Sequence, residues 1–357
     1  MGGLDGYSGL DESPQHEDFA ITIRHPDYGV RNVTYFVVDG DAIIDGDVHF
    51  GPVEELLAYS VPADTNPEDD NDEDYLDRRA LSYLPSSKSW PRGVWKYTYD
   101  SDDTETLLKT VVKQGILRWK QRAPYFTFVK VKKNARTKGI VTISAKPGSC
   151  HATVGFKGSD ENMNLNLAQP GCGPNQATHE IGHSLGKSSS TVLAFARTHI
   201  AQGYFHEHQR PDREQTVHFN CAAMKPLCPE KASLPRGKTC CDGPFKNGCC
   251  KKISNFNVVT DVARKQIDAT GSYDTKSVMH YVATAFAIPG KQTLVAARQG
   301  VEVPTQHNGV PSEEDITRLC KMYPTQCKKE APKKKKTCFS AIEEEEIELE
   351  ETEEDIL

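Results

Sequence analysis

The chain lacks any long hydrophobic run. No stretch of its 357 residues approaches the ~18 consecutive apolar residues that a transmembrane helix requires, so the sequence excludes a membrane span. The opening MGGLDGYSGLDESPQ has no basic n-region and no apolar h-region, so it does not form a signal peptide. Position 6 is Gly rather than Ser or Thr, which also excludes an N-myristoylation signal.

The body of the chain carries little net charge. The formal charge is −7, and residues 328–357 contribute most of it, with six lysines against eleven acidic residues. A nearly neutral body offers no attraction to phosphate groups, which argues against nucleic acid or an anionic membrane as a partner. No feature of the sequence indicates an oligomeric state.

The hydrophobic fraction of 37% is low for a fully folded chain. Residues 64–77 (DTNPEDDNDEDYLD) and the tail at 328–357 are strongly charged and bury nothing, which is typical of solvated segments. We therefore predict an accessory or propeptide-like segment with an acidic linker over 1–85, a folded domain over 86–327, and a disordered tail.

Eleven cysteines are a high count, and six of them lie between 221 and 250. Disulfides persist mainly in oxidising compartments, so we expect a secreted protein whose export uses a start upstream of this chain; reduced cysteines are the alternative. The doublets Cys240-Cys241 and Cys249-Cys250 lack the spacing of a zinc knuckle, which favours a disulfide-stapled insert. Six cysteines allow 15 pairings, and the sequence selects none.

Hydrophobic periodicity predicts a mixture of strands and helices. Residues 20–60 alternate short apolar runs with Asp-Gly turns, which indicates a small β-rich unit. Apolar residues recur at helical spacing over 104–122, with Thr104 as the expected cap. The segments 126–131 and 140–144 are rich in β-branched residues and are predicted strands.

The strongest chemical signal is the sequence HEIGH, which runs from His179 to His183. Residues four apart share one face of a helix, so both imidazoles can bind one ion. Zinc suits imidazole nitrogen, and its catalytic sites use three protein ligands. Glu180 is then the expected general base, acting on water. Two surface histidines on an ordinary helix are the alternative for this motif taken alone.

The wider context resembles the astacin family of zinc metalloendopeptidases, in the metzincin clan. HEIGHSLG, and farther on YFHEHQRPDR, match the family signature HExxHxxGxxHE followed by HxRxDR. The resemblance implies that Gly186 ends the helix in a sharp turn and that His206 is the third ligand. It also implies that Glu207 anchors the new N-terminus of a processed enzyme.

The chain departs from this family between the second and third histidines. His206 lies 23 positions after His183. In the family, the third histidine lies six positions after the second. Deleting residues 187–203 would restore the signature without a gap. We hypothesise that these residues are translated intron sequence; mature messenger RNA that still encodes them would refute this. A genuine insert must loop out, and His199 and His208 then become competing ligands.

Ser277–Tyr281 (SVMHY) resembles the Met-turn of the family, although alone it is also typical of a strand with a core methionine. The resemblance makes Met279 an apolar floor beneath the histidines and Tyr281 a swinging ligand that stabilises the oxyanion. It implies an α+β, metzincin-like zincin fold, with a twisted sheet, an active-site helix and an irregular C-terminal half.

Further resemblances concern covalent links, substrate and latency. Cys150 and Cys172 fall where the family has a short disulfide, and Cys320 and Cys327 would then pair with each other. IVTIS (140–144) resembles the edge strand that pairs with extended substrate. IDGD (44–47) is similar to the F-x-G-D stretch whose aspartate caps the zinc, which makes Asp47 a candidate latency ligand. A plain Asp-Gly hairpin turn is the alternative.

These features predict an endopeptidase that uses one Zn²⁺ ion and acts on a protein or peptide substrate. The main alternative is a catalytically impaired homologue that binds protein partners through its cysteine-rich insert at 221–250. The interruption at 187–203 favours that alternative, and the intact Glu180 opposes it. A zinc hydrolase acting on non-peptide substrates is a third possibility, which the Met-turn weakens.

Overall fold

The computed structural model describes nine segments of the chain: 17–25, 29–62, 89–132, 138–186, 206–228, 232–242, 249–258, 271–306 and 309–328. The acidic segment at 64–77, the insert at 187–203 and all but the first residue of the tail lie outside them. Within the described part, no helix has the length and apolarity to cross a membrane.

One mixed sheet of ten strands runs through the molecule, in the order β5-β1-β2-β3-β4-β9-β10-β8-β6-β7. The strands before the acidic linker are β1 (Phe19–His25), β2 (Gly29–Val38), β3 (Asp41–Ile44), β4 (Val48–Pro52) and β5 (Ser60–Val61), with the short helix α1 (Val53–Ala58) between the last two. The strands after it are β6 (Val94–Tyr99), β7 (Thr127–Lys130), β8 (Val141–Ser144), β9 (His151–Thr153) and β10 (Met163–Asn166).

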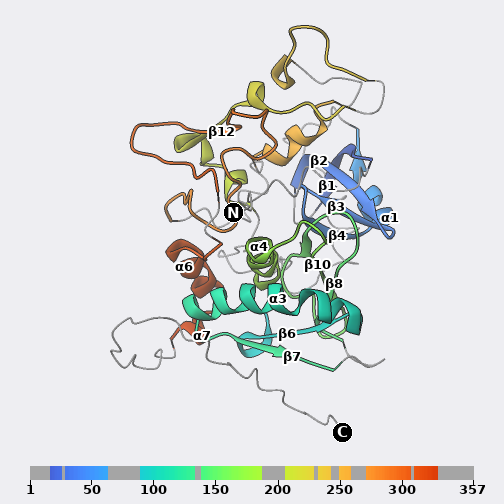
Figure 1. Ribbon diagram of the computed structural model, residues 1–357, viewed down its shortest axis with the longest axis vertical. Coiled ribbons are helices and arrows are strands. Elements are labelled where there is room, and N and C mark those ends of the chain that lie inside the picture. The colour runs from blue at the N-terminus through green and yellow to red at the C-terminus, as the bar shows by residue number, and fades with distance from the viewer. Residues whose placement is uncertain are drawn as a thin grey trace, which may run out of the picture.

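The N-terminal strands join the rest of the sheet through a single parallel pairing, β4 with β9. Figure 1 shows these blue strands lying beside the green strands of the later domain. Antiparallel neighbours connect β1 to β4, and Asp39 and Gly40 form the two-residue turn between β2 and β3. Both turn residues have positive φ, 51° and 87°, as a hairpin of this length favours.

The predicted edge strand is an interior strand. IVTIS contributes β8, which pairs in parallel with β10 on one side and β6 on the other. Of the strands after the linker, β9 and β7 lie at the two edges, and β4 pairs with the β9 edge. The assignment of 140–144 as an edge strand is therefore wrong, because β8 has a paired strand on each side.

Two long helices, α3 (Asp102–Arg122) and α4 (Pro174–Leu185), pack against each other on the sheet (Figure 1). A Cβ on Gly115 would lie 3.1 Å from the Ala177 carbonyl carbon, so glycine permits the close approach of the helices. The predicted helix is confirmed, but its cap is Ser101 and not Thr104. The Ser101 hydroxyl accepts a hydrogen bond from the Thr104 amide at 3.2 Å, because Asp102 already begins the helix.

The chain's three tryptophans hold α4 in place. The indole N–H of Trp90 donates to the Ser184 carbonyl, and that of Trp95 donates to the Ser184 hydroxyl, both at 2.8 Å. Trp119 donates to the Thr178 carbonyl, also at 2.8 Å. All three rings are buried in the main core, so their hydrogen bonds fix the position of α4 against the sheet.

The described part of the C-terminal half has little regular structure. It contains one two-stranded ribbon, formed by β11 (Val217–Phe219) and β12 (Leu294–Ala296), and the helices α6 (Glu313–Met322) and α7 (Pro324–Cys327). The other elements described in this half are short 3₁₀ turns: η3 (Glu207–Gln209), η4 (Arg213–Gln215), η5 (Cys221–Ala223), η6 (Cys240–Asp242) and η7 (Lys251–Phe256). A further 3₁₀ turn, η2 (Pro91–Gly93), lies earlier in the chain, just before β6. The predicted α+β class, with an irregular C-terminal half, is confirmed.

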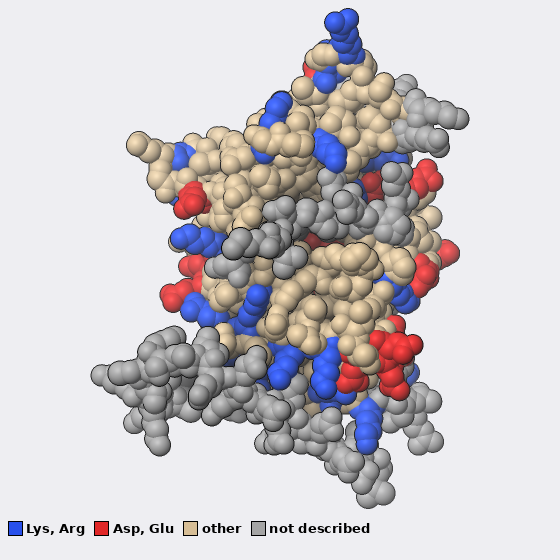
Figure 2. Space-filling model, viewed as in Figure 1, with Lys and Arg blue, Asp and Glu red and all other residues tan. Residues whose placement is uncertain are grey.

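On the face drawn in Figure 2, acidic and basic side chains lie interspersed around the rim.

Asp315 on α6 fixes the SVMHY segment. Its carboxylate accepts hydrogen bonds from the Ser277 hydroxyl at 2.6 Å, the Val278 amide at 3.0 Å and the Ser312 amide at 2.9 Å. Burial raises the pKa of Asp315, although these hydrogen bonds oppose the rise. One side chain thus both caps α6 and holds the turn that carries Met279.

Replacing Asp315 by Ala should lower the free energy of unfolding by about 3 kcal/mol, because three donors lose a buried partner. Thermal or urea unfolding measures this loss. The matched control is Glu313→Ala on the same helix, where the side chain is 93% exposed and the change should stay within about 0.5 kcal/mol. Equal stability of the two variants would contradict the assigned role.

Candidate metal centre

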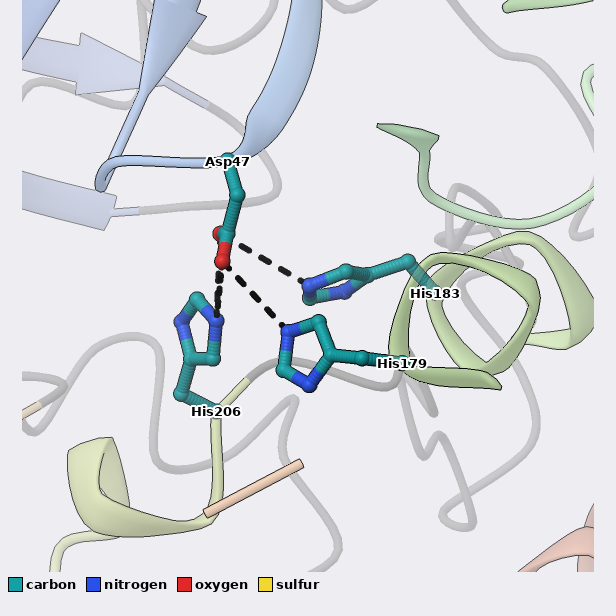
Figure 3. A group of neighbouring side chains, drawn as sticks. All are labelled: Asp47, His179, His183 and His206. Carbon is teal, nitrogen blue, oxygen red and sulfur yellow. Dashed lines mark hydrogen bonds and ion pairs between the residues drawn. The ribbon is translucent and has the colours of Figure 1, made fainter. Parts of the chain in front are cut away.

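Three histidines and one aspartate, remote in sequence, converge on one buried point. They are Asp47, His179, His183 and His206, and one ligand atom from each lies within 4.8 Å of the others. Figure 3 shows the Asp47 carboxylate entering from the N-terminal sheet to face the imidazoles. Nε2 lies 3.1 Å from the carboxylate in His206, 3.4 Å in His179 and 3.7 Å in His183.

The two helical histidines stand one turn apart on α4, with ring centroids 4.7 Å apart. Nδ1 of His179 lies 2.6 Å from the Val278 carbonyl oxygen. A carbonyl can only accept, so Nδ1 carries the proton and Nε2 turns its lone pair toward Asp47. The SVMHY segment therefore sets the tautomer of a ligand as well as lying beneath it.

His206 reaches the centre although it lies so far along the chain. Its ring centroid is 5.3 Å from that of His179 and 5.0 Å from that of His183. His208, a competing ligand in the sequence analysis, is not among the converging groups; its Nε2 donates to the Asn255 carbonyl at 2.9 Å. His199 lies outside the described residues.

Met279 lies directly under the helix that carries HEIGH. A Cβ on Gly182 would lie 2.6 Å from Met279 Sδ and 3.2 Å from Trp119 Cζ2, so a larger residue there would have to displace the Met279 side chain. Gly186 follows the last helical residue and has φ −57°, a conformation open to any residue. Glycine therefore matters at position 182, where it leaves room for Met279, more than at position 186, where the helix ends.

Asp47 is presented by a strained turn. Asp45 and Gly46 have φ of 55° and 97°, so this Asp-Gly pair forms a turn and also delivers the next residue to the centre. Arg31 forms a buried ion pair with Asp45 that fastens the turn. Burial would raise the pKa of Asp47, but the electrostatic attraction of His206 and its hydrogen bond hold the pKa well below its usual range.

Tyr281 is almost fully buried, and its hydroxyl donates to the Asp45 carbonyl at 3.0 Å. Its ring centroid lies 4.6 Å from that of His206. The turn that carries Asp47 therefore also holds the phenol that the family resemblance assigns to the oxyanion.

Glu180 is buried beside the helical histidines. Its Oε2 accepts no hydrogen bond from the described residues. Burial raises the pKa of Glu180 well above its usual value, and the Asp47 carboxylate adds to the rise. A carboxylate with a raised pKa and a spare lone pair is suited to accept a proton.

The four converging residues fit a zinc ion. Imidazole nitrogens and a carboxylate oxygen are ligands that zinc takes in tetrahedral sites. Asp47 Oδ1 is buried and has no hydrogen-bond partner among the described residues, and such an atom normally has a partner, a water or an ion. The orientation of His179 by Val278 is the outer-shell support that metal-binding histidines usually have.

Glu207 is held by two arginines. Arg318 makes a bidentate ion pair with it, Arg210 approaches Oε1 at 3.2 Å, and the Asp274 amide donates to the same oxygen at 2.9 Å. The carboxylate expected to anchor a new N-terminus is thus occupied by Arg318 in the intact chain. The sequence analysis missed Arg318, since nothing local distinguishes it from a surface charge.

Five disulfides stabilise the described residues. They join Cys150–Cys172, Cys221–Cys241, Cys228–Cys249, Cys240–Cys250 and Cys320–Cys327. Three of them lie within the insert at 221–250, and this density of cross-links is typical of an oxidising compartment.

A helix carrying HExxH, a third histidine and a methionine turn beneath them define the class of zinc metallopeptidases. Residues 83–230 match the model of the Astacin peptidase family. That region contains the three histidines and Glu180 and is therefore an astacin-type metallopeptidase domain.

The chain is similar to Nematocyst expressed protein 6 of Nematostella vectensis, 26% identical over 137 residues that make up 38% of this chain and 40% of that protein. It is 24% identical to Zinc metalloproteinase nas-14 of Caenorhabditis elegans over 66% of this chain and 37% of that protein. The chain thus spans about two-fifths of the length of these relatives. A solved structure, High choriolytic enzyme 1, a hatching enzyme zinc-protease from Oryzias latipes, aligns with a TM-score of 0.46 at 20% identity, over 67% of this chain and 94% of that one.

Replacing Gly182 by Ala should displace Met279 and weaken metal binding about tenfold, since overpacking of this size costs about 1–3 kcal/mol and about 1.4 kcal/mol corresponds to a factor of ten. Competition with a chelator measures the affinity. Gly173→Ala at the start of the same helix is the control, because its Cβ would meet nothing closer than 3.4 Å. An unchanged affinity in Gly182→Ala would exclude Met279 as the floor of the site.

Proposed function

We propose that this chain is the latent form of a zinc-dependent endopeptidase. The observation that carries the proposal is the Asp47 carboxylate, which a separate N-terminal segment holds against three histidines. The match of residues 83–230 to astacin supports the reaction class, hydrolysis of peptide bonds in proteins.

In this proposal His179, His183 and His206 hold the ion. Zinc bound there supplies a Lewis acid that polarises the scissile carbonyl and eases ionisation of water. Glu180 takes the proton from the attacking water, for which its buried position and raised pKa prepare it. Tyr281 donates from its hydroxyl to the oxygen on the tetrahedral carbon, once that hydroxyl leaves the Asp45 carbonyl.

The substrate is an extended polypeptide that lies along β9. That strand pairs with β10 on one side and with β4 of the N-terminal segment on the other. When the segment leaves, the main-chain groups of β9 become available to another strand, and such pairing depends little on side chains. The same departure withdraws Asp47 from the histidines, so substrate and ion become accessible together.

Residues 1–85 are the propeptide in this scheme, 86–327 the catalytic domain and 328–357 an appended tail. The propeptide leaves when the linker after β5 is cut. Glu207 then exchanges Arg318 for the new N-terminus, the role that the family resemblance gives it. The five disulfides support a secreted protein.

The position of His206 weighs against a catalytically impaired homologue. The interruption at 187–203 was the feature that favoured impairment, yet His206 lies among the other ligands and Glu180 is intact. Cleavage assays on protein made with and without these residues separate the two functions. Zinc content without cleavage in both forms would favour a binding module.

Replacing Glu180 by Gln should lower kcat/KM for casein peptides at least 10²-fold after removal of the propeptide, because the amide cannot accept the proton. Zinc content should remain at the wild-type value, since Glu180 is not a ligand. Glu161→Gln, at an exposed position, controls for the loss of charge. Retained activity in Glu180→Gln would remove Glu180 as the base.

Replacing Gly46 by Ala should give the intact chain measurable cleavage activity before proteolytic activation. A Cβ there would lie 3.0 Å from both Tyr281 Oη and Asn255 Nδ2, in a backbone conformation with φ +97°. Strain of about 1–3 kcal/mol should raise the basal cleavage rate of the intact chain about tenfold.

The matched control is Gly40→Ala, in the neighbouring Asp-Gly turn. It has φ +87°, and its Cβ would meet nothing within 4 Å. Both variants therefore strain the backbone, but only the one at 46 disturbs the site. Equal basal rates in the two variants would contradict propeptide latency through this turn.

A further inference from the structure

Asn255, at the end of η7, has a buried amide without an assigned role. The residue is 0% exposed, and neither Oδ1 nor Nδ2 has a hydrogen-bond partner among the described residues. A buried amide left unpaired typically costs about 1–3 kcal/mol per group, so such a group in a native protein requires an explanation.

The backbone around Asn255 is firmly held. Its carbonyl accepts hydrogen bonds from His208 at 2.9 Å and Gln209 at 3.4 Å, and Arg213 donates to the Phe256 carbonyl. Two disulfides, Cys228–Cys249 and Cys240–Cys250, end immediately before η7. These hydrogen bonds, and the disulfides of the cysteine-rich insert, therefore fix the position of the Asn255 amide.

The side chain points at the propeptide turn beside Tyr281. The position that a Cβ would occupy on Gly46 lies 3.0 Å from Asn255 Nδ2 and 3.0 Å from Tyr281 Oη. An oxygen atom at that point would lie within hydrogen-bond reach of two donors at once. Donors 2.7–3.1 Å from the developing oxyanion are the geometry that stabilises a tetrahedral transition state.

We propose that Asn255 is the second half of the oxyanion site. After the propeptide leaves, Nδ2 donates to the substrate carbonyl oxygen that Tyr281 also contacts, and this step rests on the proposed function. Because the amide is already desolvated and lacks a partner among the described residues, it gains most when charge develops on that oxygen. The cysteine-rich insert thereby positions, through the η7 segment that follows it, a residue that acts directly in catalysis.

The test compares Asn255→Ala with Asn257→Ala, an exposed residue just beyond the same 3₁₀ segment, in full-length chain activated by limited proteolysis. Loss of one oxyanion donor should lower kcat about 10²-fold and leave KM within about twofold. Asn255→Asp should lose at least as much, since a carboxylate repels the oxyanion. Asn257→Ala should match the wild type.

A second readout is inhibition by a phosphinic pseudopeptide, whose tetrahedral phosphorus and anionic oxygens mimic the transition state. Its inhibition constant should rise in Asn255→Ala by the same factor by which kcat/KM falls. An unchanged kcat, or a loss confined to KM, would overturn the assignment and make Asn255 a packing residue. Circular dichroism and thermal unfolding identify a variant that has merely failed to fold.

The outcome is different if the proposed endopeptidase function is itself wrong. If the activated wild-type chain cleaves no casein or peptide, the endopeptidase assignment fails. The Asn255 inference is then tested through calorimetric binding of the same phosphinic pseudopeptide. Equal affinity of wild type and Asn255→Ala would reject it.

Discussion

The contact between one carboxylate and three imidazoles is the constraint on which the rest of the structure depends. Asp47 is buried, and its pKa is held well below its usual range although burial alone would raise it. Maintaining that contact requires a turn with positive φ at Asp45 and Gly46, an ion pair from Arg31, and a strand, β4, paired to the catalytic sheet. The N-terminal segment therefore both covers the metal centre and contributes one of its ligand groups, Asp47.

The catalytic side of this contact is equally constrained. Three indole groups fix α4 against the sheet, Gly182 lets Met279 pack beneath it, and the Val278 carbonyl sets the tautomer of His179. Asp315 then holds the turn that supplies Val278 and Met279. The Asp45 carbonyl accepts a hydrogen bond from the Tyr281 hydroxyl. The short turn at Asp45 and Gly46 therefore contacts the proposed oxyanion donor and also presents Asp47 to the metal ligands.

Local patterns in the sequence predicted the helix at 104–122, the β-rich N-terminal unit and the convergence of His179 with His183, because each depends on neighbours along the chain. Family resemblance added His206, Met279 and Tyr281. The edge position of β9 could not be predicted, since pairing partners are set by tertiary topology. Arg318 and Asn255 were missed for the same reason: a lone charge or amide shows its burial and its partners only in the folded chain. Propensity also misplaced the helix cap by three residues, because Ser101 is available ahead of Thr104.

The central claim is that Asp47 and three histidines share one zinc ion in the intact chain. Anomalous diffraction at the zinc absorption edge, from crystals of the zinc-loaded full-length protein, tests it most directly. The account predicts a single strong peak among His179, His183, His206 and the Asp47 carboxylate. It also predicts that no carboxylate from Asp47 remains at that peak after the N-terminal segment has been removed by proteolysis. A peak elsewhere, or none at these four residues, would contradict it.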